Sequence, residues 1–225
     1  MITQIYGITN VQDAAASVEA GADYIGLVLS GPLAAENVSL KTARDIFAQI
    51  DGQVKKKVAI LDLGDCTEDG VLTLAEELGL DILHLSGAIK TSQAFWEKFK
   101  ARLPGMELMQ AIPMTGPSAL DFAEQTAPFC DYFILDSVRA DTHIIGAAGI
   151  PHDWNISRRI VDRFKDVKVI LAGGLGPDNV AEAIEFVRPF GVDSLTKTNL
   201  VTDGASLRKD IEKVRRFCEI AHSYS

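Results

Sequence analysis

Short apolar runs alternate along the chain with longer stretches in which apolar side chains recur every three or four positions. Short runs of this kind are typical of buried β-strands, and the longer periodic stretches indicate amphipathic helices. The pattern predicts strands near residues 2–6, 23–29, 56–61, 80–85, 106–111, 131–136, 168–172 and 191–195. It predicts helices near residues 10–20, 39–50, 68–78, 91–102, 117–127, 155–165, 178–188 and 205–222.

Eight strands alternating with eight helices in 225 residues favour an α/β fold of the closed (β/α)8 type, the TIM barrel. No Pro- or Ser-rich linker divides the chain, so we predict a single domain over residues 1–225. A weak repeat in which an Asp follows a helix end supports this organisation. We expect its aspartates at the N-terminal face of the barrel, in structural roles: Asp23, Asp81, Asp131 and Asp193.

Composition narrows the possible partners. The chain is 47% apolar and 24% charged, as expected of a soluble globular protein with a sizeable core. Its net charge of −9 comes without a dense basic patch, which argues against nucleic acid or an anionic membrane as the main partner. An anionic ligand would therefore need local positive potential, from loop N–H groups, helix N-termini or a few cations.

The cysteines and the hydropathy predict a cytoplasmic protein. Cys66, Cys130 and Cys218 are odd in number and widely spaced, which fits neither a zinc site nor a disulfide framework. No basic leader opens the chain, and no apolar run reaches about 18 residues. The histidines lack metal-ligand spacing, so we expect no metal, and nothing in the sequence calls for a cofactor.

A glycine-rich segment follows the predicted seventh strand. Val169-Ile-Leu-Ala-Gly-Gly-Leu-Gly176 ends an apolar run in two glycines, and Pro177-Asp-Asn-Val180 then opens a helical pattern. Gly173 and Gly174 allow the backbone to approach a ligand closely, and successive N–H groups there suit an anion. Loops after the seventh and eighth strands commonly bind phosphate in βα-barrels. We therefore predict a phosphate site at this loop.

Chemistry in such barrels lies at the carboxyl ends of the strands. The residues found there include Tyr6, His84 and Asp136, and Thr196-Lys197 after the last strand. A carboxyl group buried in a barrel mouth has a raised pKa and can act as a general acid. His84, His143 and His152 all fall near this face, where a histidine can transfer protons or bind a ligand.

These strand ends, taken in order, resemble one family. The matching stretches are Gln4-Ile-Tyr-Gly-Ile-Thr-Asn10, Gly21-Ala-Asp-Tyr-Ile-Gly-Leu-Val28, Ile134-Leu-Asp-Ser137, Asp153-Trp154 and Leu171-Ala-Gly-Gly-Leu-Gly-Pro-Asp-Asn-Val180. They are similar to motifs of phosphoribosylanthranilate isomerase, over nearly the whole chain and in the right order. That family performs an Amadori rearrangement of an aminoaldose phosphate to an aminoketose phosphate.

The resemblance implies roles for individual residues. Asp136 matches the family's general acid, which opens the furanose ring. Tyr6 stands where the family has a cysteine that acts as base, and His84 lies on the neighbouring part of the mouth. Gly149, Gly173, Gly174, Thr196 and Lys197 fall where the family binds phosphate.

Several positions depart from the family pattern. Tyrosine has an ordinary pKa near 10 against about 8.5 for cysteine, so a phenol is the poorer base at neutral pH. Gln4 replaces a family lysine, and the arginine after the second strand is missing. Lys197 replaces a glycine and either adds an ammonium group to the phosphate or fills its site. His152 stands in for a phenylalanine.

Three functions remain open from the sequence. The one we favour is a divergent isomerase or proton-transfer enzyme that acts on a small phosphorylated sugar or related anion. The second is a true phosphoribosylanthranilate isomerase of tryptophan biosynthesis with an unusual base. The third is a barrel that binds a phosphorylated ligand without catalysis. A homodimer is possible, but no pattern in the chain specifies one.

Overall fold

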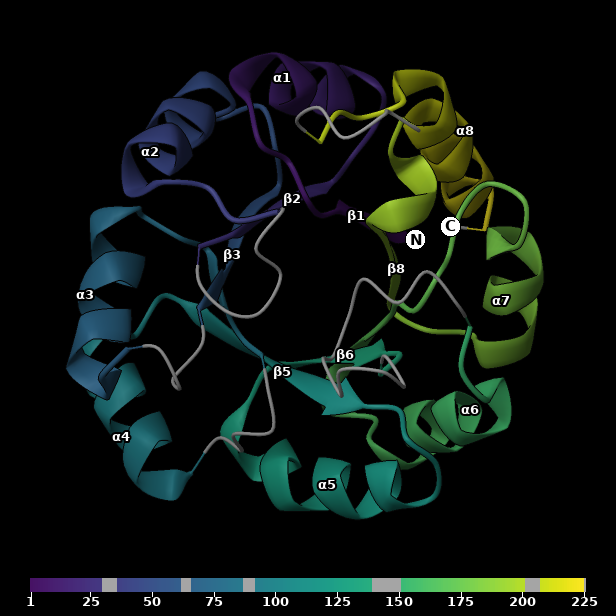
Figure 1. Cartoon of the computed structure of the whole chain (residues 1–225). Coiled ribbons are helices and arrows are strands. Elements are labelled where there is room, and N and C mark those ends of the chain that lie inside the picture. Colours follow the sequence, from purple (N-terminus) through teal and green to yellow (C-terminus); the bar gives the residue numbers. More distant parts are fainter. Residues whose placement is uncertain (30–35, 62–65, 87–91, 139–150, 201–206, 225) are drawn as a thin grey trace.

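Parallel strands pair in sequence order and close into a barrel, with the helices arranged as an outer ring (Figure 1). The computed structural model describes residues 1–29, 36–61, 66–86, 92–138, 151–200 and 207–224. Within them the strands are β1 (Ile2–Ile5), β2 (Tyr24–Val28), β3 (Lys56–Leu61), β4 (Ile82–Leu85), β5 (Glu107–Pro113), β6 (Tyr132–Asp136), β7 (Lys168–Leu171) and β8 (Gly191–Ser194). The predicted (β/α)8 fold is confirmed.

Helices follow the strands in strict alternation. They are α1 (Val11–Glu19), α2 (Leu40–Gln49), α3 (Glu68–Glu77), α4 (Gln93–Arg102), α5 (Ser118–Thr126), α6 (Trp154–Arg163), α7 (Val180–Val187) and α8 (Ile211–His222). Short 3-10 turns, η1 (Ala127–Phe129) and η2 (Thr196–Thr198), were not predicted. The last helix starts later than predicted, at Ile211. Among the described residues, no helix is both long and apolar enough to cross a bilayer.

Local sequence explains where several helices begin. The side chains of Asn10, Ser39, Thr67 and Ser92 each accept a hydrogen bond from a backbone N–H in the first turn of the following helix. Such N-caps satisfy donors that the helix itself leaves unpaired. Each of these helices begins after the carboxyl end of a strand, so its N-terminus lies at that face of the barrel.

Two apolar cores hold the layers together. The larger one fills the space between the sheet and the helix ring, and includes Phe95, Phe99, Phe133 and Phe217. The smaller one lies inside the barrel and is built from inward-pointing strand residues, with Tyr6 and Tyr132 among them. Because the inner core is packed with side chains, a ligand can enter only above it, at the mouth.

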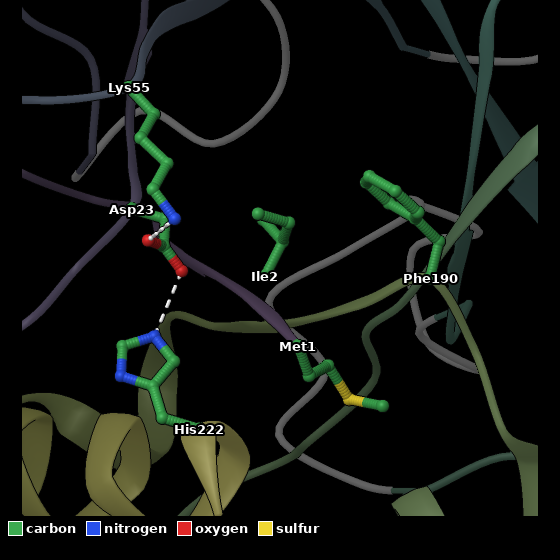
Figure 2. Close-up of a pocket in the computed structure, with 6 residues that line it drawn as sticks. All are labelled: Met1, Ile2, Asp23, Lys55, Phe190 and His222. Atoms are coloured by element: carbon green, nitrogen blue, oxygen red, sulfur yellow. Dashed lines mark hydrogen bonds and ion pairs between the residues drawn. The ribbon is translucent and has the colours of Figure 1, made fainter. Parts of the chain in front are cut away.

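The opposite, N-terminal face carries the aspartates of the sequence repeat. Asp23 accepts hydrogen bonds from the backbone N–H of Thr3 and pairs with Lys55 and with His222 of α8. Figure 2 shows this cluster in a pocket of about 410 Å³ that is lined by Met1, Ile2, Asp23, Lys55, Phe190 and His222. Asp81 and Asp131 likewise accept from the backbone N–H groups of Lys57 and Leu108. The structural role predicted for these three aspartates is confirmed.

Asp193, the fourth aspartate of the repeat, does not share their place. It is the third residue of β8, and it is buried inside the barrel, where Gln4 donates a hydrogen bond to it at 3.2 Å. The prediction was wrong because Gln4 of β1 pairs with both Tyr24 and Asp193, so Asp193 aligns with Tyr24 rather than with Asp23. A shift of one residue turns the side chain to the other face of the sheet, here into the barrel. Asp193 therefore belongs to the site rather than to the N-terminal face.

Candidate functional site

Asp136 is the last residue of β6 and lies at the mouth of the barrel. Its Oδ1 accepts a hydrogen bond of 2.8 Å from the backbone N–H of Ser137, and the backbone N–H of Gly173 also donates to this carboxyl. Desolvation by the surrounding protein raises the pKa of Asp136 to about 7, and the two hydrogen bonds oppose that rise. The carboxyl can therefore hold a proton near neutral pH.

Asp193 lies at the same height in the barrel. Leu135 of β6 pairs with Leu171, and Leu171 pairs with Val192 of β8, so the next residues, Asp136 and Asp193, share one level two strands apart. Burial raises the pKa of Asp193 well above its usual range, and the charge of Asp136 raises it further. The two carboxyls thus form a pair in which the charge of one resists the ionisation of the other.

Tyr6 and His84 meet directly across the barrel. The Tyr6 hydroxyl lies 2.7 Å from Nδ1 of His84, and both side chains are buried. Burial, and then the charge of Asp193, raises the pKa of Tyr6 well above 10, while burial lowers the pKa of His84 to about 3. Both groups are neutral at pH 7, so the phenol donates to the imidazole. His84 Nε2 has no partner among the described residues.

A glycine makes room for this pair. A Cβ atom on Gly26 of β2 would lie 2.4 Å from the ring of Tyr6, closer than real Cβ contacts allow. The aromatic ring therefore rests directly on the backbone of β2. Successive side chains of a strand point to opposite faces, so Tyr6 was predicted to point into the barrel. Its contact with His84 was not predicted.

Lys209 is a buried cation beside the carboxyl pair. Its ammonium donates to the backbone carbonyl of Leu195 and to Oδ1 of Asn199, at 3.1 and 2.6 Å. Burial lowers the pKa of Lys209 to about 7, although the charge of Asp193 acts in the opposite direction. Lys209 was not among the site residues predicted from the sequence.

The glycine-rich loop after β7 adopts the backbone that its sequence predicted. Gly173 and Gly174 have φ values of +81° and +66°, which side chains other than glycine rarely adopt. The side chain of Asn179 fixes the loop, since it accepts from the N–H of Gly176 and donates to the carbonyl of Gly174. These two hydrogen bonds hold the backbone of the loop in place at the barrel mouth.

A pocket of about 310 Å³ opens next to this loop. Gly174, Gly176 and Lys197 of η2 line it, together with Lys213 and Arg216 of α8. The lining also includes the carboxylate of Asp178, which pairs with Arg216 at 3.5 Å, and Lys213 pairs with Asp210 at 3.3 Å. Cations still outnumber acids in the lining, so the pocket has the local positive potential that an anion needs in a chain of net charge −9. Lys213 and Arg216 were missed because nothing in the sequence shows that α8 packs against the start of α7.

The predicted phosphate residues are brought together in part. Gly174 and Lys197 line the same pocket, and Gly173 and Thr196 adjoin them in the chain. Gly149 and His143 lie outside the described residues. Of the predicted catalytic residues, Tyr6 contacts His84, and Asp136 is paired with Asp193 rather than with either of them.

His152, which precedes α6, also reaches this face. Its Nδ1 lies 3.2 Å from Oγ of Ser137, and its Nε2 lies 2.8 Å from Oγ of Ser157. Burial lowers the pKa of His152 to about 4, so the ring is neutral at pH 7 and joins the two hydroxyls. Its proximity to Asp136 in the chain was visible in the sequence, but these contacts were not.

The fold and this arrangement define a class of protein: a (β/α)8 barrel with acidic groups at the carboxyl ends of its strands, beside a glycine-rich, cation-lined pocket. The family model described as N-(5'phosphoribosyl)anthranilate (PRA) isomerase matches residues 3–219. The chain belongs to this family, and it is an isomerase on that ground. The resemblance found in the sequence motifs is thus confirmed.

Individual relatives agree. The chain is 31% identical over 216 residues to the N-(5'-phosphoribosyl)anthranilate isomerase of Methanocella arvoryzae, covering 96% of this chain and 95% of that protein. The solved phosphoribosyl anthranilate isomerase of Thermotoga maritima has a TM-score of 0.81 and 27% identity, covering 99% of this chain and 100% of that one. A phosphoribosyl anthranilate isomerase in complex with reduced 1-(o-carboxyphenylamino)-1-deoxyribulose 5-phosphate has a TM-score of 0.79 and 26% identity, with the same coverage.

Proposed function

We propose that this chain isomerises a phosphorylated aminoaldose to the aminoketose, with N-(5'-phosphoribosyl)anthranilate as its substrate. The observation that carries the proposal is the pair of carboxyls at one level of the barrel mouth, Asp136 and Asp193, each with a raised pKa. A reaction that needs both an acid and a base near neutral pH can draw both from such a pair.

The first step is ring opening. Protonated Asp136 donates its proton to the furanose ring oxygen, the bond from C1 to that oxygen breaks, and the nitrogen lone pair forms the C1–N double bond of an iminium. A pKa near 7 suits this step, because a substantial fraction of Asp136 is protonated at neutral pH. The resemblance assigned the same role to Asp136.

The second step removes the proton from C2. Asp193, whose pKa burial raises to about 8, takes that proton in the fraction of molecules in which Asp193 is ionised and Asp136 entered the reaction protonated. The C2–H electrons form a C1–C2 double bond while the iminium nitrogen becomes neutral. The resulting enolamine then tautomerises to the aminoketose. Tyr6 and His84, which were predicted as catalytic, are both neutral and hydrogen-bonded to each other. We therefore assign Tyr6 and His84 a structural role, in which their side chains define the shape of the mouth next to Asp193.

The phosphate lies at the glycine-rich loop in this proposal. Gly173 and Gly174 provide the close backbone approach, Thr196 provides a hydroxyl donor, and Lys197 with the cations of α8 provides positive charge. The ligand bound to the related isomerase is a 5-phosphate, which supports a phosphorylated ligand here. Homodimerisation, a membrane-free setting and a cytoplasmic location stay predictions.

A different phosphorylated sugar is the second candidate. Tyr6 is 2% exposed and belongs to the inner core of the barrel, where its ring takes more space than the family's cysteine would, and Lys197 lines the phosphate pocket. Both side chains leave less room than smaller residues would, which favours a substrate with a smaller group on C1 than anthranilate.

The test is turnover of freshly generated phosphoribosylanthranilate, followed through the loss of its anthranilate fluorescence. The proposal expects turnover by the wild-type protein and a loss of at least about 10² in rate for Asp136→Asn. No turnover in a folded sample would contradict phosphoribosylanthranilate as the substrate. A thermal-shift screen of sugar phosphates, followed by product analysis, would then separate another isomerase from a barrel that only binds.

A further inference from the structure

His152 contacts the end of β6 and the loop after β7, and each of these two segments donates a backbone N–H group to the Asp136 carboxyl. Its ring lies between the hydroxyls of Ser137 and Ser157, at 3.2 and 2.8 Å. Ser157 is in the first turns of α6, and it is fully buried. The ring is thus anchored on the helix at one nitrogen and reaches the end of β6 with the other.

The same ring closes on the loop after β7. A Cβ atom on Gly173 would lie 2.7 Å from Nδ1 of His152 and 2.5 Å from Oγ of Ser137. Gly173, Ser137 and His152 are therefore packed against one another with no room for an added methyl group. Ser137 and Gly173 are also the residues whose backbone N–H groups donate to Asp136.

We propose that His152 is a positioning residue for Asp136, because it fixes Ser137 and the Gly173 backbone so that both N–H groups point at the carboxyl. His152 does not touch the reacting atoms in this account. It acts through the two donors, which favour the ionised form of the carboxyl. The inference rests on the proposed function only for its effect on catalysis.

The charged and titratable groups around Asp136 define what else acts on it. Asp193 of β8 interacts with Asp136 through its charge, and Lys209 interacts with Asp193 in turn. His152 and Asp153 lie just before α6. His152 is neutral at pH 7, so its own charge does not perturb Asp136. Loss of its two hydrogen bonds would instead loosen Ser137 and Gly173, and the pKa of Asp136 would move upward from about 7.

The test measures the titration of Asp136 without substrate, by carbon-13 NMR of its labelled carboxyl group. His152→Phe keeps a ring of similar size but removes both hydrogen bonds, and the proposal expects its titration midpoint to rise. His152→Gln can still join two hydroxyls, and it should return the midpoint toward the wild-type value. His222→Phe makes the same chemical change at the N-terminal face, and it should leave the midpoint unchanged.

Kinetics provide the second readout. His152→Phe should lower kcat by on the order of tenfold, since small displacements of a catalytic group are costly, while KM changes less. It should also shift upward the apparent pKa that Asp136 contributes to the kcat profile, together with the NMR midpoint. Ser137→Ala should have little further effect in the His152→Phe background, because both changes break one link.

Equal Asp136 titrations in wild type and His152→Phe would overturn the inference, even if the protein turns over substrate. A raised midpoint that His152→Gln restores would support the inference, even if no substrate is turned over. The failure of the inference and the failure of the proposed function are therefore separate results. A His152→Phe midpoint matched by His222→Phe would also overturn the inference, since it would reflect a general loosening of the fold.

Discussion

Asp136 and Asp23 are the same residue type in opposite electrostatic settings. Asp23 accepts from Thr3 and pairs with Lys55 and His222, and these partners outweigh burial and lower its pKa. Among the described residues Asp136 has two backbone donors and no cation paired with it, and desolvation raises its pKa to about 7. Placement relative to charge, rather than residue type, therefore decides which carboxyl is a structural anion and which can exchange protons.

Replacing Asp136 tests its role directly. Asp136→Asn should reduce turnover by a factor of about 10² to 10⁴, the usual contribution of a general acid, because an amide cannot donate the proton. The measurement is kcat, with circular dichroism to show that the fold is intact. Asp162→Asn, which changes an exposed carboxylate that pairs with Arg158 and Lys165, is the matched control and should keep wild-type rates. An active Asp136→Asn protein would remove this carboxyl from the mechanism.

The hydroxyl of Tyr6 should contribute to stability. Tyr6→Phe leaves His84 Nδ1 buried without its partner, which should lower the free energy of unfolding by about 1–3 kcal/mol. Urea denaturation measures the loss. Tyr224→Phe removes a hydroxyl that bonds Glu185 on the exposed surface, and it should change stability by less than about 0.5 kcal/mol. Equal losses in the two variants would contradict the buried Tyr6–His84 bond.

At the residue scale, sequence alone predicted single positions better than pairs. Asp136 was found because it ends a strand, and Tyr6 because its parity points inward. Asp193 was assigned to the wrong face, since the pairing register that aligns it with Tyr24 rather than with Asp23 is not visible in one sequence. The partners Lys213 and Arg216 depend on the packing of α8 against α7, which no local pattern encodes.

At the element scale, the β7–α7 loop was the most predictable part of the site. An apolar run, paired glycines and a Pro-Asp-Asn helix start occur within a dozen residues, and each has a local physical cause. The fold showed one constraint that the sequence did not reveal. Gly173 needs a positive φ, and its missing side chain also admits Ser137 and His152.

Two glycine variants separate these two requirements. Gly173→Ala meets both backbone strain and a 2.5 Å contact, so it should lower the free energy of unfolding by more than about 2 kcal/mol and weaken phosphate binding. Gly116→Ala also has a positive φ, of +127°, but its Cβ atom would meet nothing within 4 Å. Thermal denaturation and phosphate calorimetry compare the two. Similar losses of stability in both would show that packing at Gly173 adds nothing.

At the scale of the whole molecule, ion pairs join the two ends of the chain. Asp13 of α1 accepts from Arg208 and from the backbone N–H of Lys209, and Asp23 pairs with His222 of α8. Although burial acts to raise them, their hydrogen bonds and cations lower both pKa values. The stabilisation from these carboxyls is therefore present above the unfolded pKa near 3.9, and it is lost as the pH falls through the lower folded values.

Asp136 makes the opposite contribution to the pH dependence. Its folded pKa of about 7 exceeds the unfolded value near 3.9, so its ionisation progressively destabilises the fold between those pH values. Asp136→Asn should therefore raise the free energy of unfolding by about 4 kcal/mol at pH 8, and it should change it little at pH 4. Urea titrations at the two pH values measure this difference. A variant that is less stable than wild type at pH 8 would contradict the raised pKa.

The global fold was the feature most accessible from sequence. Eight apolar runs and eight amphipathic stretches in strict alternation leave few topologies other than a barrel, and parallel neighbours follow from the helical crossovers. The ion pair between Asp23 and His222 was not predicted, because the two residues lie 199 positions apart in the sequence. Long-range pairs of this kind become visible only after the ring has closed.

The central claim is that Asp136 and Asp193 act as an acid and base pair. The most direct measurement is the pH profile of kcat for phosphoribosylanthranilate between pH 5 and 9, in wild type and in Asp193→Asn. We expect a bell-shaped profile with an optimum near neutrality in wild type. In Asp193→Asn we expect a loss of at least about 10² in kcat and the disappearance of one limb. A wild-type rate that does not vary with pH, or an Asp193→Asn protein with the wild-type rate and profile, would contradict the account.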